Sequence, residues 1–190
     1  MQTFLKMTVL MAGALLLAAP VLAADGQFAI GGNLGYATLT GDDFQAADDG
    51  FGVNGSLRYN MVNGFGINGA VQWNSHDVKG TDESFNMLRI GVEPRYNFSL
   101  SNPVFTPYLG ARAMWIRESA DNNMSANGWG FGATGGMIFQ TSPNFGIELG
   151  LSYDAISFGD IKVDGNTLEN SDTSGGSFSI MTGIVYSFSK

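Results

Sequence analysis

The sequence predicts an all-β protein, an eight-stranded antiparallel up-and-down transmembrane β-barrel preceded by a cleaved signal peptide. Two observations carry this prediction. Eight stretches alternate apolar and polar residues with a period of two, which is the pattern of a strand with two different faces. The first 23 residues instead form an apolar segment behind a single positive charge, which is typical of an exported protein.

The N-terminal segment has the parts of a secretory signal peptide. Lys6 supplies the positive charge, an apolar run follows from Met7 to Ala19, and Val21-Leu22-Ala23 places small residues before a cut. The apolar run of about 13 residues is shorter than the roughly 20 that a membrane helix needs. We therefore expect a signal peptide at residues 1–23 and one barrel domain at residues 24–190.

Each predicted strand has one apolar face, as Phe65, Ile67 and Trp73 show in the third. The strands are expected at residues 27–40, 51–61, 65–76, 85–98, 105–117, 128–140, 145–157 and 177–188. Long connections at residues 41–50, 77–84, 118–127 and 158–176 alternate with three short ones. Membrane barrels have long extracellular loops and short periplasmic turns, so both ends of the barrel domain are expected on the periplasmic side. The fourth long connection contains a predicted hairpin around Asp164-Gly165.

The polar face of the strands decides between a membrane barrel and a water-soluble one. This face carries small or uncharged residues such as Asn54, Ser56 and Thr134, and no lysine lies within any predicted strand. A face in contact with water would usually carry many Lys and Glu residues. We therefore expect the apolar face to meet lipid and the polar face to fill a narrow lumen.

The charged residues within the strands share the polar face, and we expect them to form a salt-bridged interior network. Shifting the strand register by one residue would turn four arginines toward lipid, at about 2–4 kcal/mol each near the midplane. The particular ion pairs stay open, and a charged constriction that selects small solutes is the alternative reading. The expected network is Arg58, Arg89, Glu93, Arg95, Arg112, Glu148 and Asp154.

Aromatic residues gather at two depths, as membrane interfaces favour. The extracellular group is expected to contain Trp73, Trp115 and Trp129. The periplasmic group is expected to contain Phe65, Phe98, Phe105, Phe139, Phe145 and Phe188.

The last strand has a spaced ending, with Gly183, Tyr186 and Phe188 followed by Ser189 and Lys190. Together with the strand pattern of the whole mature chain, it resembles the small eight-stranded outer-membrane barrels of bacteria, the OmpA/OmpX-like and opacity-protein-like group. The resemblance implies that the barrel-assembly machinery reads this ending. It also implies a location in the outer membrane of a diderm bacterium, reached through the periplasm.

The sequence offers no set of residues for catalysis, metal binding or a cofactor. His76 is the single histidine, and its neighbour Ser75 points to the opposite face of the strand, so we expect a solvated rim residue and no enzyme. There is no cysteine, and 17 acids against 9 Lys and Arg exclude a basic nucleic-acid surface. We expect the acidic fourth connection to be a solvated loop without a bound cation.

These features predict a structural or adhesin-like surface protein with acidic extracellular loops. The expected partners are outer-membrane lipid and lipopolysaccharide, the assembly machinery, and a host or envelope partner at the loops; a monomer is expected. The alternatives are a narrow porin-like channel for small solutes and, less favoured, a lipid-modifying envelope enzyme.

Overall fold

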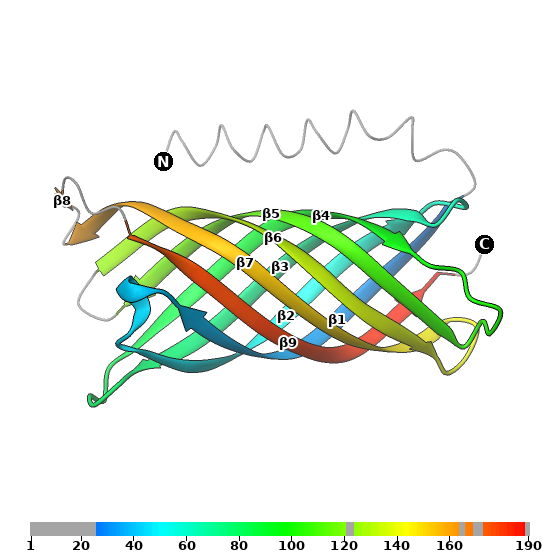
Figure 1. Ribbon diagram of the computed structural model, residues 1–190, viewed down its shortest axis with the longest axis horizontal. Helices are drawn as coiled ribbons and strands as arrows, with labels where there is room; N and C mark the ends of the chain where they lie inside the picture. Colours follow the sequence, from blue (N-terminus) through cyan, green and yellow to red (C-terminus); the bar gives the residue numbers. More distant parts are fainter. Residues whose placement is uncertain (1–25, 121–123, 164–165, 169–172, 189–190) are drawn as a thin grey trace.

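The computed structural model describes residues 26–120, 124–163, 166–168 and 173–188. In these residues eight long strands form one closed antiparallel barrel (Figure 1), which confirms the predicted fold class. Consecutive strands pair with each other, and β9 closes the barrel by pairing with β1. The predicted signal peptide lies outside the described residues. The long strands are β1 (Gln27–Thr40), β2 (Ala47–Asn60), β3 (Phe65–Val78), β4 (Ser84–Asn97), β5 (Phe105–Ala120), β6 (Met124–Gln140), β7 (Phe145–Val163) and β9 (Thr173–Ser187).

The barrel has two ends that differ in their connections. We call the inner end the one where β1 begins and β9 stops, and the outer end the opposite one (Figure 1). The outer end contains the short 3-10 helix η2 (Asp42–Phe44). It also contains β8 (Asn166–Leu168), which pairs with the last residues of β7 as a hairpin outside the barrel wall. The predicted hairpin is thus present, while residues 164–165 at its tip lie outside the described residues.

The strands reach farther at the outer end than the sequence pattern predicts. β2 begins four residues early at Ala47, and β7 runs six residues past the predicted end to Val163. Strand ends at the inner end agree with the prediction to within one residue. The long connections predicted from the sequence are therefore wrong in their bounds, because the strands extend into each of them. Outside the apolar band, backbone pairing no longer requires strict alternation of side chains.

The two faces of the wall have opposite character, as predicted. Large apolar side chains such as Leu34, Phe51 and Phe131 are exposed on the outside. Polar and charged side chains such as Asn68, Gln72 and Arg89 are buried inside. None of the described residues forms a helix long and apolar enough to cross a membrane.

The interior is polar only over its inner and middle parts, which corrects the expectation of a lumen filled by short polar groups. Toward the outer end the inward positions carry large apolar residues, which form one buried cluster. This part of the barrel therefore has the kind of core that a water-soluble domain has. The outer-end cluster consists of Leu39, Phe44, Phe85, Met87, Met114, Ile116, Ala126, Ile156 and Phe158.

Candidate functional site: the barrel interior and the outer end

Glu148 is the centre of the inner part of the charge network. Its Oε2 lies 2.5 Å from Arg58 Nη2 and accepts a hydrogen bond of 2.9 Å from Asn33 Nδ2. Its Oε1 lies 3.5 Å from Arg95 Nη1, an ion pair without hydrogen-bond geometry. Arg95 also holds Glu93, with 2.5 Å between Nη2 and Oε1. These contacts join β1, β2, β4 and β7 across the lumen.

Asp154 is the centre of the second part of the network, nearer the apolar cluster. Arg112 contacts both of its carboxylate oxygens, with 2.5 Å between Nε and Oδ1. Arg112 also donates a hydrogen bond of 3.0 Å to Ser152 Oγ. Arg89 lies farther away, with 3.9 Å between its Nη1 and Asp154 Oδ2. The structure thus brings all seven sequence-predicted charged residues into the lumen, in one group around Glu148 and another around Asp154.

Little space is left between these side chains. The buried ring of Tyr108 packs against Arg95, with its centroid 4.2 Å from Arg95 Cζ. One cavity of about 40 Å³ lies among these side chains. One buried water needs about 10–15 Å³ of such volume, so the cavity has room for only a few water-sized particles. The middle of the barrel is therefore a packed interior and not an open pore.

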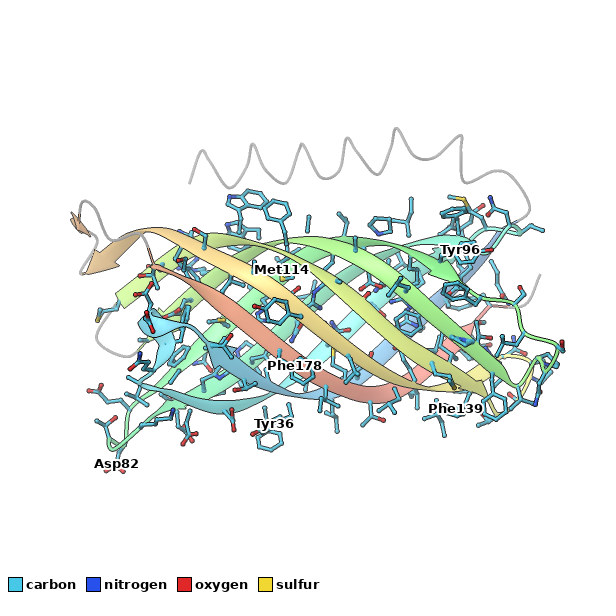
Figure 2. The ribbon with its side chains drawn as sticks, in the orientation of Figure 1. Tyr36, Asp82, Tyr96, Met114, Phe139 and Phe178 are labelled. Carbon is cyan, nitrogen blue, oxygen red and sulfur yellow. The ribbon has the colours of Figure 1, made fainter. Side chains whose placement is uncertain are left out.

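The aromatic residues named from the sequence lie on the outer wall at both ends. Near the outer end, Trp115 lies directly opposite Trp129 on the neighbouring strand, and Trp73 is 44% exposed. At the inner end aromatic pairs recur, with ring centroids 5.4 Å apart for Phe105 and Phe139. Figure 2 shows Phe139 and Tyr96 at this end. The other four, Phe65, Phe98, Phe145 and Phe188, are all exposed on the wall.

His76 does not lie on a solvated rim, and this expectation was wrong. The side chain is fully buried inside the barrel, stacked on Phe85 with ring centroids 5.2 Å apart. His76 is two residues after Asn74 and four after Gln72, so it lies on the same inward face of β3 as these two residues. The spacing in the sequence could therefore have predicted that His76 faces the lumen. Its Nδ1 lies 3.1 Å from the carbonyl oxygen of Asp48, so Nδ1 carries the proton and donates. His76 lies beyond Trp73 toward the outer end, and burial lowers its pKa below the ordinary value.

The connection between β1 and β2 packs on the apolar cluster at the outer mouth of the barrel. Phe44 of η2 is 7% exposed and packs on Phe158, with ring centroids 6.2 Å apart. The backbone N–H of Ser174 donates a 2.8 Å hydrogen bond to Asp43 Oδ2, and the backbone N–H of Lys79 donates one of 2.8 Å to the Ala46 carbonyl. We call residues 41–46 the mouth segment. The sequence pattern missed it because Phe44 stands alone in a polar stretch.

The outer end carries an excess of exposed acids. Among the described residues of this end, Lys79 and Arg117 are the exposed bases. Asp82 lies at the tip of the β3–β4 hairpin (Figure 2). Tyr36 donates a hydrogen bond to Asp49, which holds the pKa of that carboxyl below its usual value. The exposed acids are Asp42, Asp43, Asp48, Asp49, Asp77, Asp82 and Glu83.

The chemistry available at these sites is that of packing and charge. No group of three or more His, Cys, Asp or Glu side chains that could hold a metal ion occurs in the described part of the chain. Ser75 and His76 lie on opposite faces of β3, so they do not form a nucleophile and base pair. The acids that the sequence places in the fourth connection have no described side chains.

The end of β9 is held in the wall by backbone and aromatic contacts. The backbone N–H of Phe188 donates a 2.9 Å hydrogen bond to the carbonyl of Phe28. Tyr186 lies between two other rings, 5.0 Å from Phe145 and 5.1 Å from Phe188. Gly183 lies opposite Asn33 of β1, at the seam that closes the barrel.

Comparison with known proteins gives one family match. The model of the outer membrane protein beta-barrel domain matches residues 9–188. A search of curated protein sequences gave no match.

Solved structures with the same fold have low sequence identity. Neisserial surface protein A is 23% identical over 85% of this chain and 97% of its own, with a TM-score of 0.65. The outer membrane protein OprG from Pseudomonas aeruginosa is 14% identical over 87% of this chain and 97% of its own, with a TM-score of 0.60. A major outer membrane protein from Thermus thermophilus is 17% identical over 86% of this chain and 99% of its own, with a TM-score of 0.55. These likenesses show the fold alone.

Proposed function

We propose, from the premise that this chain belongs to the outer membrane protein β-barrel family, that it is a closed surface barrel acting through its outer end. Membership implies a location in the outer membrane. The proposal concerns what the protein does there: a structural and surface-interaction role, in which the lumen holds the barrel together and the outer end meets other molecules.

The filled lumen is the observation that carries this proposal. Ion pairs between Arg58, Glu148 and Arg95 cross its inner part, and the outer-end cluster fills the rest below the mouth segment. A solute would have to break buried ion pairs and displace packed aromatic rings to pass. Leaving one member of a buried ion pair without its partner costs about 3–5 kcal/mol. A narrow channel is therefore the less favoured function.

The charge of the outer end supports a proposal about the kind of partner. Exposed carboxylates outnumber exposed bases there, and a surface of one sign raises the local concentration of oppositely charged groups. We propose a basic host or envelope partner, or lipopolysaccharide bridged by divalent cations. The wall itself contacts outer-membrane lipid, and the protein acts as a monomer without enzymatic activity.

Export and insertion precede this role. We propose that residues 1–23 direct the chain to the periplasm and are removed after Ala23. The barrel-assembly machinery would then read Gly183, Tyr186 and Phe188 at the end of β9. The exposure of Phe188 on the wall supports this reading.

Two measurements test the proposal. Purified, folded protein in planar bilayers is expected to show no steady conductance; a stable, large open state would support the channel instead. Cells carrying the protein are expected to bind a polycation, and replacing Asp42, Asp43, Asp82 and Glu83 by their amides should weaken that binding. The matched control is Asn63→Asp, which adds an acid to the inner-end turn and should leave binding to intact cells unchanged.

A further inference from the structure

Arg89 is the arginine of the network that lacks a close carboxylate. Its side chain is 1% exposed, and its nearest carboxylate oxygen, Asp154 Oδ2, lies 3.9 Å from Nη1. Its Nη2 donates to Ser177 Oγ at 3.0 Å and contacts Met87 Sδ at 3.3 Å. Among the described residues, neither Nε nor Nη1 has a hydrogen-bond acceptor.

The other buried charges are already matched. Arg58 and Arg95 share Glu148, Arg95 also holds Glu93, and Arg112 occupies both oxygens of Asp154. Among the described residues of the network, four guanidinium groups thus face three carboxylates, and Arg89 has only the 3.9 Å contact with Asp154, whose two oxygens Arg112 already occupies. Glu118 also points inward, but it is only half-buried near the outer mouth and forms no ion pair with Arg89.

An unmatched guanidinium inside the barrel is unfavourable. Arginine keeps its proton in proteins, so it cannot become neutral as a buried lysine does. A buried charge is normally paired, because an unpaired charge is strongly unfavourable in a low-dielectric interior. The structure around Arg89 therefore requires either a bound counter-charge or enough water to replace one.

The surroundings of Arg89 favour an anion over a larger ligand. The cavity of about 40 Å³ admits only a few water-sized particles. Its charged lining consists of four arginines and two carboxylates, so positive charge is in excess there: Arg58, Arg89, Arg95, Arg112, Glu93 and Glu148. Further buried donors without partners lie on neighbouring inward positions, Asn74 Nδ2 beside Met87 and Ser179 Oγ next to Ser177 along β9. The arrangement offers hydrogen-bond donors, one surplus positive charge and little space.

We propose that the barrel holds one small monovalent inorganic anion of the halide class beside Arg89, between the ion-pair network and the outer-end cluster. The anion accepts hydrogen bonds from Arg89 Nε and Nη1. It balances the charge of the lumen and helps keep it closed.

Bromide is the probe that tests the site directly. Crystals of the folded protein grown in sodium bromide are expected to show an anomalous peak in contact with the Arg89 guanidinium. Ordered water alone at Arg89, or bromide bound only on the outside of the barrel, would overturn the proposal.

A stability measurement provides the second test and its control. Replacing gluconate by chloride at equal ionic strength should raise the denaturation midpoint of the wild-type protein. Arg89→Met should lose this rise, while Arg117→Met, at an exposed position of the same barrel, should keep it. An equal rise in wild type and Arg89→Met contradicts the proposal. If Arg89→Met does not fold, the bromide crystals of the wild-type protein decide.

Discussion

Glu148 shows how one residue can hold four strands together. It contacts Arg58, Asn33 and Arg95, which come from three other strands, and it is 3% exposed. Removing one partner of a buried ion pair lowers the free energy of unfolding more than removing both partners, because the remaining charge stays buried without a partner. The residue should therefore be more sensitive to substitution than the number of its hydrogen bonds suggests.

The variant Glu148→Gln keeps the shape of the side chain and removes its charge. We expect its free energy of unfolding to fall by about 3–5 kcal/mol, because Arg58 and Arg95 lose their shared partner. Urea titration of the folded protein in detergent micelles measures this change.

The double variant Arg58→Met with Glu148→Met should lose less free energy of unfolding than Glu148→Gln. The control Glu83→Gln, at an exposed position of the outer end, should leave stability unchanged; equal stability of wild type and Glu148→Gln would contradict the network's role.

Single residues on the outer wall test the membrane orientation. Leu151 is 47% exposed and lies on the outward face of β7 midway between Phe145 and Ser157, the partner of Trp129. We expect Leu151→Arg to lower the free energy of unfolding in lipid bilayers by about 2–4 kcal/mol, as at a bilayer midplane. Ser157→Arg, on the same face near the outer aromatic residues, should cost only about 0–1 kcal/mol. Equal costs at the two positions would show that the wall between them does not cross lipid.

The sequence predicted all eight long strands, but it did not predict where most of them begin or stop at the outer end. Between the aromatic groups, lipid on one side and a filled lumen on the other force strict alternation, so the pattern locates each strand. Past Trp129 the inward positions carry an apolar core, and we expect water on the outside, so the alternation of apolar and polar residues weakens. For this reason the sequence pattern predicted a start of β6 at residue 128, whereas the strand begins at Met124.

The ion pairs could not be predicted for a different reason. Arg58 of β2 meets Glu148 of β7 across the lumen, 90 residues apart in the sequence. Which inward residues meet depends on the tilt and stagger of all the strands together. The parity of each residue predicts that it faces inward, as for His76, but not what it contacts there. Phe44 gave no periodic signal because it lies in a connection.

The mouth segment is the element whose stability differs most from that of the wall. It is anchored by Phe44 and by a few hydrogen bonds, so it should open locally before the barrel unfolds. Phe44→Ala removes its main apolar contact, at a cost of about 3 kcal/mol. Amide hydrogen exchange in residues 41–46 should then be faster by roughly hundredfold, since each 1.4 kcal/mol is about tenfold.

The matched control for the mouth segment is Leu100→Ala, at an exposed position of the inner-end turn. It should leave exchange in residues 41–46 unchanged. Exchange in the inner half of β9 should stay slow in both variants, because the barrel wall remains closed. Unchanged exchange in Phe44→Ala would mean that the segment is held by its hydrogen bonds alone.

For the molecule as a whole, closure at one seam turns a sheet with two edges into a barrel. β1 and β9 pair from Ala29 with Ser187 to Thr40 with Gly176, and this pairing satisfies the backbone groups that an open edge would expose to lipid. The ion-pair network and the outer-end cluster fill the closed space. A substitution that prevents β1 from pairing with β9 should therefore unfold the whole barrel. A substitution in the mouth segment should leave the barrel folded.

Gly183 and Gly32 allow this seam to be tested with matched substitutions. A Cβ atom at Gly183 would lie 2.0 Å from the carbonyl oxygen of Gly32 and 2.6 Å from Asn33 Cα, and neither backbone atom can move without separating the strands. A Cβ atom at Gly32 would meet nothing within 4 Å. We expect Gly183→Ala to lose most of the folded band that unboiled barrels show on a gel, because β9 can no longer approach β1. Gly32→Ala should keep that band. Refolding purified chains in detergent separates this effect from recognition by the assembly machinery, and a folded band of wild-type intensity in Gly183→Ala would show that the seam closes with a side chain present.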